Sequence, residues 1–166
     1  MAIPKSVWQY EPCEKILFVG SCFAEHIGSR FEQEKFLTLV NPFGVMYNPV
    51  SILHTLQRCT SVPRIVFLTL GTNHVYRLKE TGAIVDNCEK RPQRLFAEEK
   101  LPVEACADYL RQSVDLLRER NSEVNVVLTV SPIRYRKYGY HESQLSKAVL
   151  LMAVERLLDG MACVNY

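Results

Sequence analysis

The sequence predicts a three-layer α/β/α sandwich around a mainly parallel, five-stranded sheet. Two observations lead to this prediction: strand-like apolar runs alternate with helical patterns, and two of those runs are apolar almost throughout. Strands buried on both faces have that composition, and parallel sheets covered by helices contain such strands. With right-handed crossovers we expect the flavodoxin-like strand order 2-1-3-4-5, with a small β-hairpin insertion near residues 74–87.

Five segments carry the strand pattern, with centres near residues 18, 38, 67, 127 and 164. The third and fourth, at 65–70 and 124–130, are the almost wholly apolar ones. Between them, the segments 74–78 and 83–85 flank a turn in which Gly82 suits a positive φ. Two strand-like segments joined by such a turn predict a β-hairpin.

Four segments carry helical patterns. The first starts near Phe23, and apolar residues recur there at i, i+4 and i+8. Asn48 and Pro49 are a good N-cap and first-turn pair for the second helix, and Pro102 opens the third. The fourth covers residues 141–159. Its predicted apolar stripe consists of Leu145, Val149, Met152 and Leu157.

Length and composition describe an ordinary globular domain. The 166 residues suit one domain, and the formal net charge of +2 gives no reason to expect nucleic acid or an anionic membrane as partner. No apolar run approaches the roughly 18 residues of a membrane span, and the first residues do not form a signal peptide, so we expect a cytoplasmic protein. The fifth strand is incomplete at Tyr166. We therefore expect residues 1–166 to be a single domain truncated at its C-terminal end.

The six cysteines are irregularly spaced and contain no C-x-x-C pair. This spacing favours reduced, mostly structural cysteines and predicts neither a metal site nor a bound cofactor. Ligand sites of parallel sheets lie at the carboxyl ends of the strands, so residues that follow each strand are the candidates for function.

Gly20 and Ser21 follow the first strand and precede the first helix. A glycine permits a sharp turn there, and the helix directs free N–H groups and its positive dipole end toward the serine. That position would stabilise an alkoxide or a tetrahedral oxyanion. Serine is also a common N-cap, and the spacing alone favours that structural role.

Several sequence blocks resemble those of one known family. Gly-Ser-Cys-Phe-Ala at 20–24 is the signature that names the GSCFA family, and the segments 41–49, 71–76 and 131–134 are similar to later blocks of that family. The segments 87–90 and 144–148 also resemble blocks of the pattern, in the same order. The resemblance covers essentially the whole chain, so the protein is identified as a member of the GSCFA family.

The resemblance implies likeness to the SGNH hydrolases. In their pattern the serine after the first strand attacks an acyl carbon, which assigns Ser21 as the catalytic nucleophile. The pattern also implies that Gly44 and Asn73 complete the oxyanion hole. Both positions have structural alternatives, because Gly44 suits a turn after Asn-Pro and Asn73 suits a loop. An Asp-x-x-His element supplies the base in that pattern; the chain contains none, and we expect it beyond Tyr166.

Three further residues are candidates for substrate binding. His74 follows a strand end, while Arg134 and Tyr135 belong to a basic, aromatic cluster after the fourth strand. That cluster suits an anionic or sugar substrate, although an ordinary solvated loop has the same composition. The other histidines, at 26, 54 and 141, are predicted to be structural.

The leading functional hypothesis is therefore a serine esterase that acts on an O-acyl ester of a small molecule, with a carbohydrate ester as one candidate. The alternative is a non-catalytic ligand-binding module on an SGNH scaffold. The family pattern often has histidine at positions 89 and 135, where this chain has Glu89 and Tyr135, and this favours the alternative. A third hypothesis makes Cys22, at the helix N-terminus, a reactive thiol.

Overall fold

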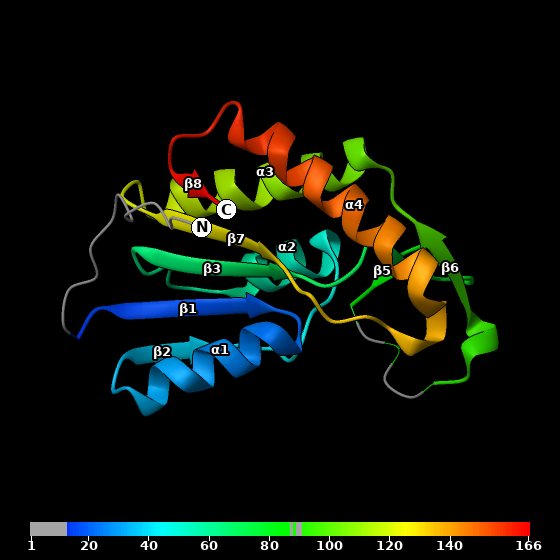
Figure 1. The fold of residues 1–166 in the computed structure, drawn as a ribbon, viewed down its shortest axis with the longest axis horizontal. Helices are drawn as coiled ribbons and strands as arrows, with labels where there is room; N and C mark the ends of the chain where they lie inside the picture. Colours follow the sequence, from blue (N-terminus) through cyan, green and yellow to red (C-terminus); the bar gives the residue numbers. More distant parts are fainter. Residues whose placement is uncertain (1–12, 87, 89–90) are drawn as a thin grey trace.

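A computed structural model describes residues 13–86, 88 and 91–166 of the chain. Its main sheet has five strands in the order β2-β1-β3-β7-β8, and every neighbouring pair is parallel (Figure 1). These strands are β1 (Lys15–Gly20), β2 (Leu37–Val40), β3 (Ile65–Leu70), β7 (Asn125–Val130) and β8 (Val164–Asn165). The predicted fold class, strand order and strand positions are confirmed.

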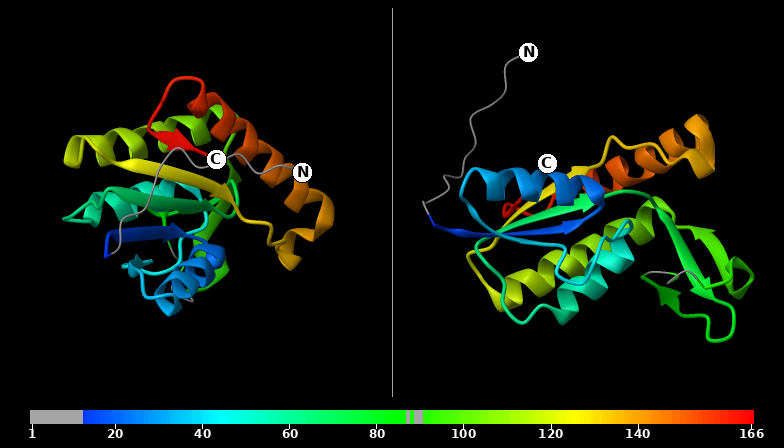
Figure 2. Two further views of the ribbon diagram at one scale, coloured as in Figure 1. Left: turned by 60° about the vertical axis from the view of Figure 1, so that its left-hand side comes forward. Right: turned by 90° about the horizontal axis from the view of Figure 1, so that it is seen from below.

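Four helices cover the two faces of this sheet. They are α1 (Cys22–Gln33), α2 (Pro49–Arg58), α3 (Val103–Arg120) and α4 (Gly139–Leu158). Helix α1 packs on one face, where Phe18 and Phe67 stack 4.7 Å apart and contact Phe31. The other three helices share a larger core cluster with the opposite face of the same strands. Figure 2 shows α1 on one side of the sheet and α2 with α3 on the other.

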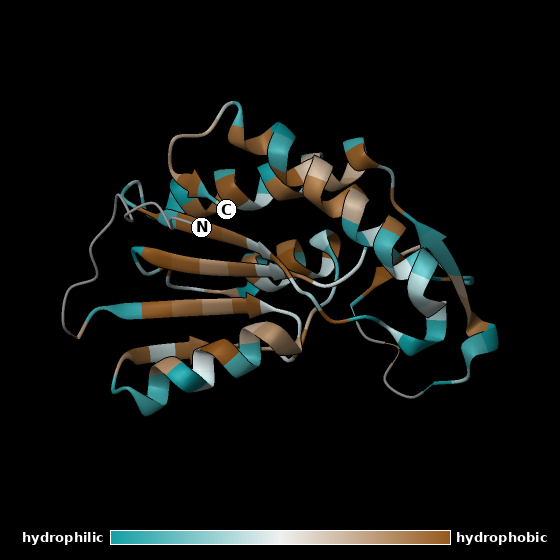
Figure 3. Ribbon diagram, viewed as in Figure 1, coloured by the Kyte–Doolittle hydropathy of each residue, from teal (hydrophilic) through white to brown (hydrophobic). Residues whose placement is uncertain are grey.

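The side-chain alternation of the central strands produces these two clusters. In β1, Ile16 and Phe18 face α1, whereas Leu17 and Val19 belong to the larger cluster. All four side chains are completely buried, as expected for a strand with helices on both faces. Figure 3 shows the corresponding hydrophobic colour along the central strands.

A second, antiparallel sheet lies beyond the carboxyl ends of the main strands (Figure 1). It consists of β4 (His74–Leu78), β5 (Ile84–Val85) and β6 (Phe96–Lys100), in the order β5-β4-β6. The predicted hairpin is confirmed, and Gly82 has a φ of +71° in its turn. Strand β6 has four exposed residues out of five and carries no apolar alternation, so the sequence did not predict it.

The buried face of α4 differs from the predicted stripe. Leu145 and Met152, predicted to be buried, have 49% and 54% of their surface exposed. The polar residues Ser143, Ser146 and Lys147 occupy buried positions instead. The side chains of Ser146 and Lys147 form hydrogen bonds with the loop after β3, at residues 71–73. Those bonds fix which side of α4 faces the sheet.

Candidate functional site

Ser21 lies at the carboxyl end of β1, where the strand turns into α1. Its backbone N–H donates to the Thr69 carbonyl at 3.0 Å, which continues the β1–β3 ladder by one residue. The serine is the N-cap of α1, and its hydroxyl accepts a hydrogen bond of 3.3 Å from the Phe23 N–H. The residue is completely buried. The predicted N-cap role is therefore present in the structure.

Gly20 is required directly before this serine. Its φ is +145°, and a Cβ at this position would lie 2.1 Å from the Thr69 carbonyl oxygen. Its N–H donates to Asn41 Oδ1 at 2.8 Å, and its carbonyl accepts from the Met46 N–H at 2.9 Å. The family blocks at 20–24 and 41–49 thus meet at Gly20.

The block at 41–49 also contacts the block at 71–76. The Tyr47 carbonyl accepts hydrogen bonds from the N–H groups of Gly71 and Thr72, both at 2.8 Å. Because Tyr47 follows β2 and Gly71 follows β3, these bonds tie together the loops on both sides of β1. Three motifs that are far apart in the sequence therefore form one network at the carboxyl edge of the sheet.

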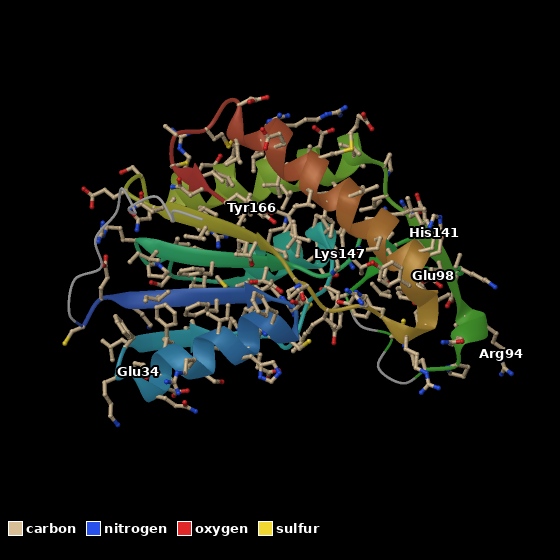
Figure 4. The ribbon with its side chains drawn as sticks, viewed as in Figure 1. Glu34, Arg94, Glu98, His141, Lys147 and Tyr166 are labelled. Carbon is tan, nitrogen blue, oxygen red and sulfur yellow. The ribbon has the colours of Figure 1, made fainter. Side chains whose placement is uncertain are left out.

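Helix α4 holds the loop after β3 from the other side. Ser146 Oγ accepts from the Asn73 N–H at 3.0 Å and contacts Thr72 Oγ1 at 3.0 Å. The Lys147 ammonium donates to the Gly71 carbonyl. Burial lowers the pKa of Lys147 to about 8, and the nearby Cys22 thiol opposes this shift. Figure 4 shows Lys147 where α4 passes the ends of the central strands.

Gly44 and Asn73 lie in loops at the same edge as Ser21, but their donors have other partners. The Gly44 N–H donates to the Asn41 carbonyl at 2.8 Å within the 41–44 turn. The Asn73 amide nitrogen donates to the Leu101 carbonyl at 2.7 Å, and its buried Oδ1 has no hydrogen-bond partner. Their oxyanion-hole roles stay predictions. The single N–H of Gly44 would have to leave the Asn41 carbonyl, whereas the Asn73 amide nitrogen has a second N–H besides the one bonded to Leu101.

The three predicted substrate-binding residues are only partly brought together. His74 and Tyr135 line the same cavity, whereas Arg134 is exposed and stacks its guanidinium 4.7 Å from the centre of the Tyr140 ring. The Tyr135 hydroxyl is buried without a hydrogen-bond partner and lies against Gly71. Burial raises its pKa, so the hydroxyl remains a neutral donor. Glu89 lies outside the described residues.

This cavity has a volume of about 710 Å³ and lies between the carboxyl-edge loops and the second sheet. Rings from both regions line it: Tyr47, Tyr76, Phe96, Tyr135 and Tyr138. The Tyr47 and Tyr135 rings meet edge to face with centroids 5.8 Å apart. Ser21 does not line the cavity.

Charged groups of the cavity are held in a network at its outer wall. Glu98 bonds His74 Nδ1 at 3.0 Å and the Lys137 ammonium at 2.7 Å. Burial acts to raise the pKa of Glu98, but hydrogen bonds from Lys137, Tyr138 and His74 lower it to about 2. Figure 4 shows Glu98 on β6. Within the described part of the chain, no group of three metal-binding side chains gathers.

Sequence reasoning missed Glu98, Lys137 and Lys147. Glu98 lies on the unpredicted strand β6, where the pairing of Tyr76 with Glu98 brings it near His74. Lys137 belongs to the basic, aromatic cluster and Lys147 to the block at 144–148, but the sequence assigns neither lysine a role of its own. The one available signal was the block at 144–148, whose polar residues interrupt the apolar pattern of α4.

The fold and site together define a mainly parallel α/β sandwich with a buried serine at its carboxyl edge and an aromatic cavity beside that edge. The chain belongs to the GSCFA family, because the model of that family matches residues 15–64 and 60–166. No curated protein matches it. Across the residues that the structure describes, no helix is both long and apolar enough to cross a membrane.

Proposed function

We propose that this protein is a serine ester hydrolase, with Ser21 as nucleophile, that acts on O-acyl esters of a polyhydroxylated compound. The supporting observation is the place of Ser21: its hydroxyl lies at the N-terminus of α1, at the carboxyl edge of a parallel sheet. The partial positive charge of a helix N-terminus favours an anion formed there. Attack on the ester would release the alcohol and leave an acyl-serine, which water then hydrolyses.

The completely buried serine has to become accessible before it can react. Tyr47 and Tyr135 are the candidates for controlling this access, because both line the cavity, their rings meet edge to face, and the Tyr135 hydroxyl lies against Gly71 at the carboxyl edge. Tyr47 is the more exposed of the two. We propose that substrate binding displaces these rings and opens a path from the cavity to Ser21.

A serine also needs a base to accept its proton. Among the described residues, His54 Nδ1 bonds Asp86 at 2.7 Å and His74 Nδ1 bonds Glu98, and no histidine bonds the Ser21 hydroxyl. The likeness to SGNH hydrolases assigns the base to an Asp-x-x-His element. Residues 1–166 contain no such element, so the proposed mechanism requires a base besides the residues of this sequence.

The second candidate function is a ligand-binding module without catalysis. The complete burial of Ser21 favours it, as does the Gly44 N–H, which is already bonded to the Asn41 carbonyl. Under this proposal the cavity binds its ligand and Ser21 serves only as the N-cap of α1.

One experiment separates the two candidates. The natural full-length protein is treated with a fluorophosphonate probe, and hydrolysis of acetylated sugars is assayed for the wild type and Ser21→Ala. A hydrolase should be labelled at Ser21 and should lose at least about a thousandfold of its rate in the variant. Ser51→Ala, another buried serine early in a helix but outside the cavity, is the matched control and should retain its rate. Hydrolysis that survives Ser21→Ala would exclude the proposal.

A further inference from the structure

The cavity wall holds a histidine whose hydrogen bonding is incomplete. His74 is only 5% exposed, and its Nδ1 bonds the Glu98 carboxylate at 3.0 Å. Its Nε2 is buried and has no hydrogen-bond partner. An unpaired buried polar atom destabilises the protein, so a ligand group that pairs with it contributes to binding.

The surroundings decide whether this atom donates or accepts. Burial lowers the pKa of His74 below its ordinary value, although the Glu98 hydrogen bond opposes the shift. The imidazole is therefore neutral, and its one proton belongs on Nδ1 because Glu98 is anionic. That assignment leaves Nε2 as a hydrogen-bond acceptor, which needs a hydroxyl or amide group as partner.

The charges of the cavity are balanced by the protein itself. The Lys137 ammonium bonds Glu98, and Asp86 pairs with His54 at 2.7 Å and approaches Arg58 at 3.9 Å. Among the described residues that line the cavity, each carboxylate thus has a basic partner. A ligand with its own charge would have to displace one of these partners, so the cavity favours a neutral ligand.

Aromatic rings lie beside the histidine that carries the free acceptor. The Tyr138 ring stacks on His74 with centroids 4.0 Å apart, and it lies 6.0 Å from the Tyr135 ring. The Tyr135 hydroxyl is a second buried polar atom without a partner, and it can donate where Nε2 accepts. Rings beside hydrogen-bonding groups suit a ligand that has both C–H faces and hydroxyl groups.

We propose that His74, oriented by Glu98, binds a hydroxyl group of a neutral carbohydrate in this cavity through Nε2. This inference rests on the proposed function for the identity of the site, since it names the alcohol part of the ester. Testing this binding site requires no hydrolysis, because a sugar without an acyl group should bind to it. Because Nε2 is buried, side chains beside it have to move before a hydroxyl group can reach this nitrogen.

The test is a ¹H–¹⁵N NMR titration of the natural protein with the methyl glycosides of glucose and N-acetylglucosamine. We expect a neutral glycoside to shift the amide signals of β4, β6 and the 136–138 turn. His74→Phe keeps a ring but removes the acceptor, and it should weaken binding about tenfold, which corresponds to about 1.4 kcal/mol. His74→Gln can still accept and should restore part of the affinity. His26→Ala, which changes an exposed histidine on α1, is the control and should bind like the wild type.

Three results would overturn the inference: no neutral glycoside shifts these signals, His74→Phe binds as tightly as the wild type, or glucose 6-phosphate binds more tightly than the methyl glucoside. Ser21→Ala should bind the glycosides normally. If Ser21→Ala keeps hydrolysis while His74→Phe loses binding, the proposed nucleophile is wrong and the carbohydrate site stands.

Discussion

At the scale of single residues, the site depends on contacts that local sequence patterns do not contain. The position of Ser21 after a strand and before a helix could be predicted from the order of the residues around it. Its burial could not, because Asn41 and Met46, which come from the loop after β2, hold the turn closed. The same applies to His74, whose partner Glu98 is 24 residues away on another strand.

The glycines at 20 and 44 provide a matched pair of predictions. Both have a positive φ, but only at Gly20 would a Cβ collide with backbone; at Gly44 nothing lies within 4 Å. Gly20→Ala should therefore lower the free energy of unfolding by roughly 3 kcal/mol or more, and Gly44→Ala by about 1–2 kcal/mol. Urea denaturation of both variants measures the difference. Equal losses would show that the turn before Ser21 can relax.

Lys147 gives a prediction about pH. Its pKa is about 8 in the folded protein because burial disfavours the ammonium, whereas an unfolded lysine has the ordinary value of 10.5. Between these values the unfolded chain binds more protons, so this residue makes the folded state more stable as pH rises from 8 to 10.5. Over that range, the free energy of unfolding of the wild type should rise by roughly 2–3 kcal/mol more than that of Lys147→Met.

Denaturant unfolding at several pH values measures this difference. Subtracting the curve of Lys147→Met removes the contribution of the other titrating groups. Lys79→Met, at an exposed position in the turn between β4 and β5, is the control, and its curve should run parallel to that of the wild type. A difference curve for Lys147→Met that is flat between pH 8 and 10.5 would contradict the lowered pKa.

At the scale of elements, the helix caps and strand runs could be read from the sequence, and the facing of α4 could not. Asn48 caps α2 as predicted, with its side chain accepting from the Ser51 N–H at 3.0 Å. Helix α4 was assigned its face by apolar spacing alone. Hydrogen bonds from Ser146 and Lys147 to the 71–73 loop instead fix a partly polar buried face. Such long-range polar contacts leave no periodic signal in the sequence.

The attachment of α4 to this loop can be tested with two serines. Ser146→Ala leaves the buried Asn73 N–H without its partner and should lower the free energy of unfolding by about 1–3 kcal/mol. Ser143 is equally buried on the same helix, but its hydroxyl makes only a 3.4 Å bond to the Tyr135 carbonyl. Ser143→Ala should therefore cost less than about 1 kcal/mol. Thermal unfolding of the two variants distinguishes them, and a smaller loss for Ser146→Ala than for Ser143→Ala would exclude this role.

At the scale of the whole molecule, the main sheet was predictable and the second sheet only in part. Strand β3 is buried along nearly its whole length, and β7 buries Val126 and Leu128 in the larger core cluster, so the core determines the apolar pattern of both strands. Strand β6 owes its place to backbone pairing with β4, and its side chains from Ala97 to Lys100 are exposed. Because the exposed side chains of β6 show no hydrophobic alternation, the cavity wall that this strand forms could not be predicted from the sequence.

The difference in burial between the main sheet and the second sheet predicts where the molecule is least stable. The second sheet contributes Val75, Phe96 and few other buried apolar side chains, whereas β1 and β3 are buried along nearly their whole length. Local opening is cheapest where few apolar contacts are lost. Amide hydrogens of β5 and β6 should therefore exchange at least about a hundredfold faster than those of β3, as measured by native-state hydrogen exchange with NMR.

A bound glycoside should slow the exchange of amide hydrogens in β6 and leave exchange in β3 unchanged, because the glycoside contacts only the cavity wall. Equal protection in both sheets would show instead that the cavity wall unfolds together with the core.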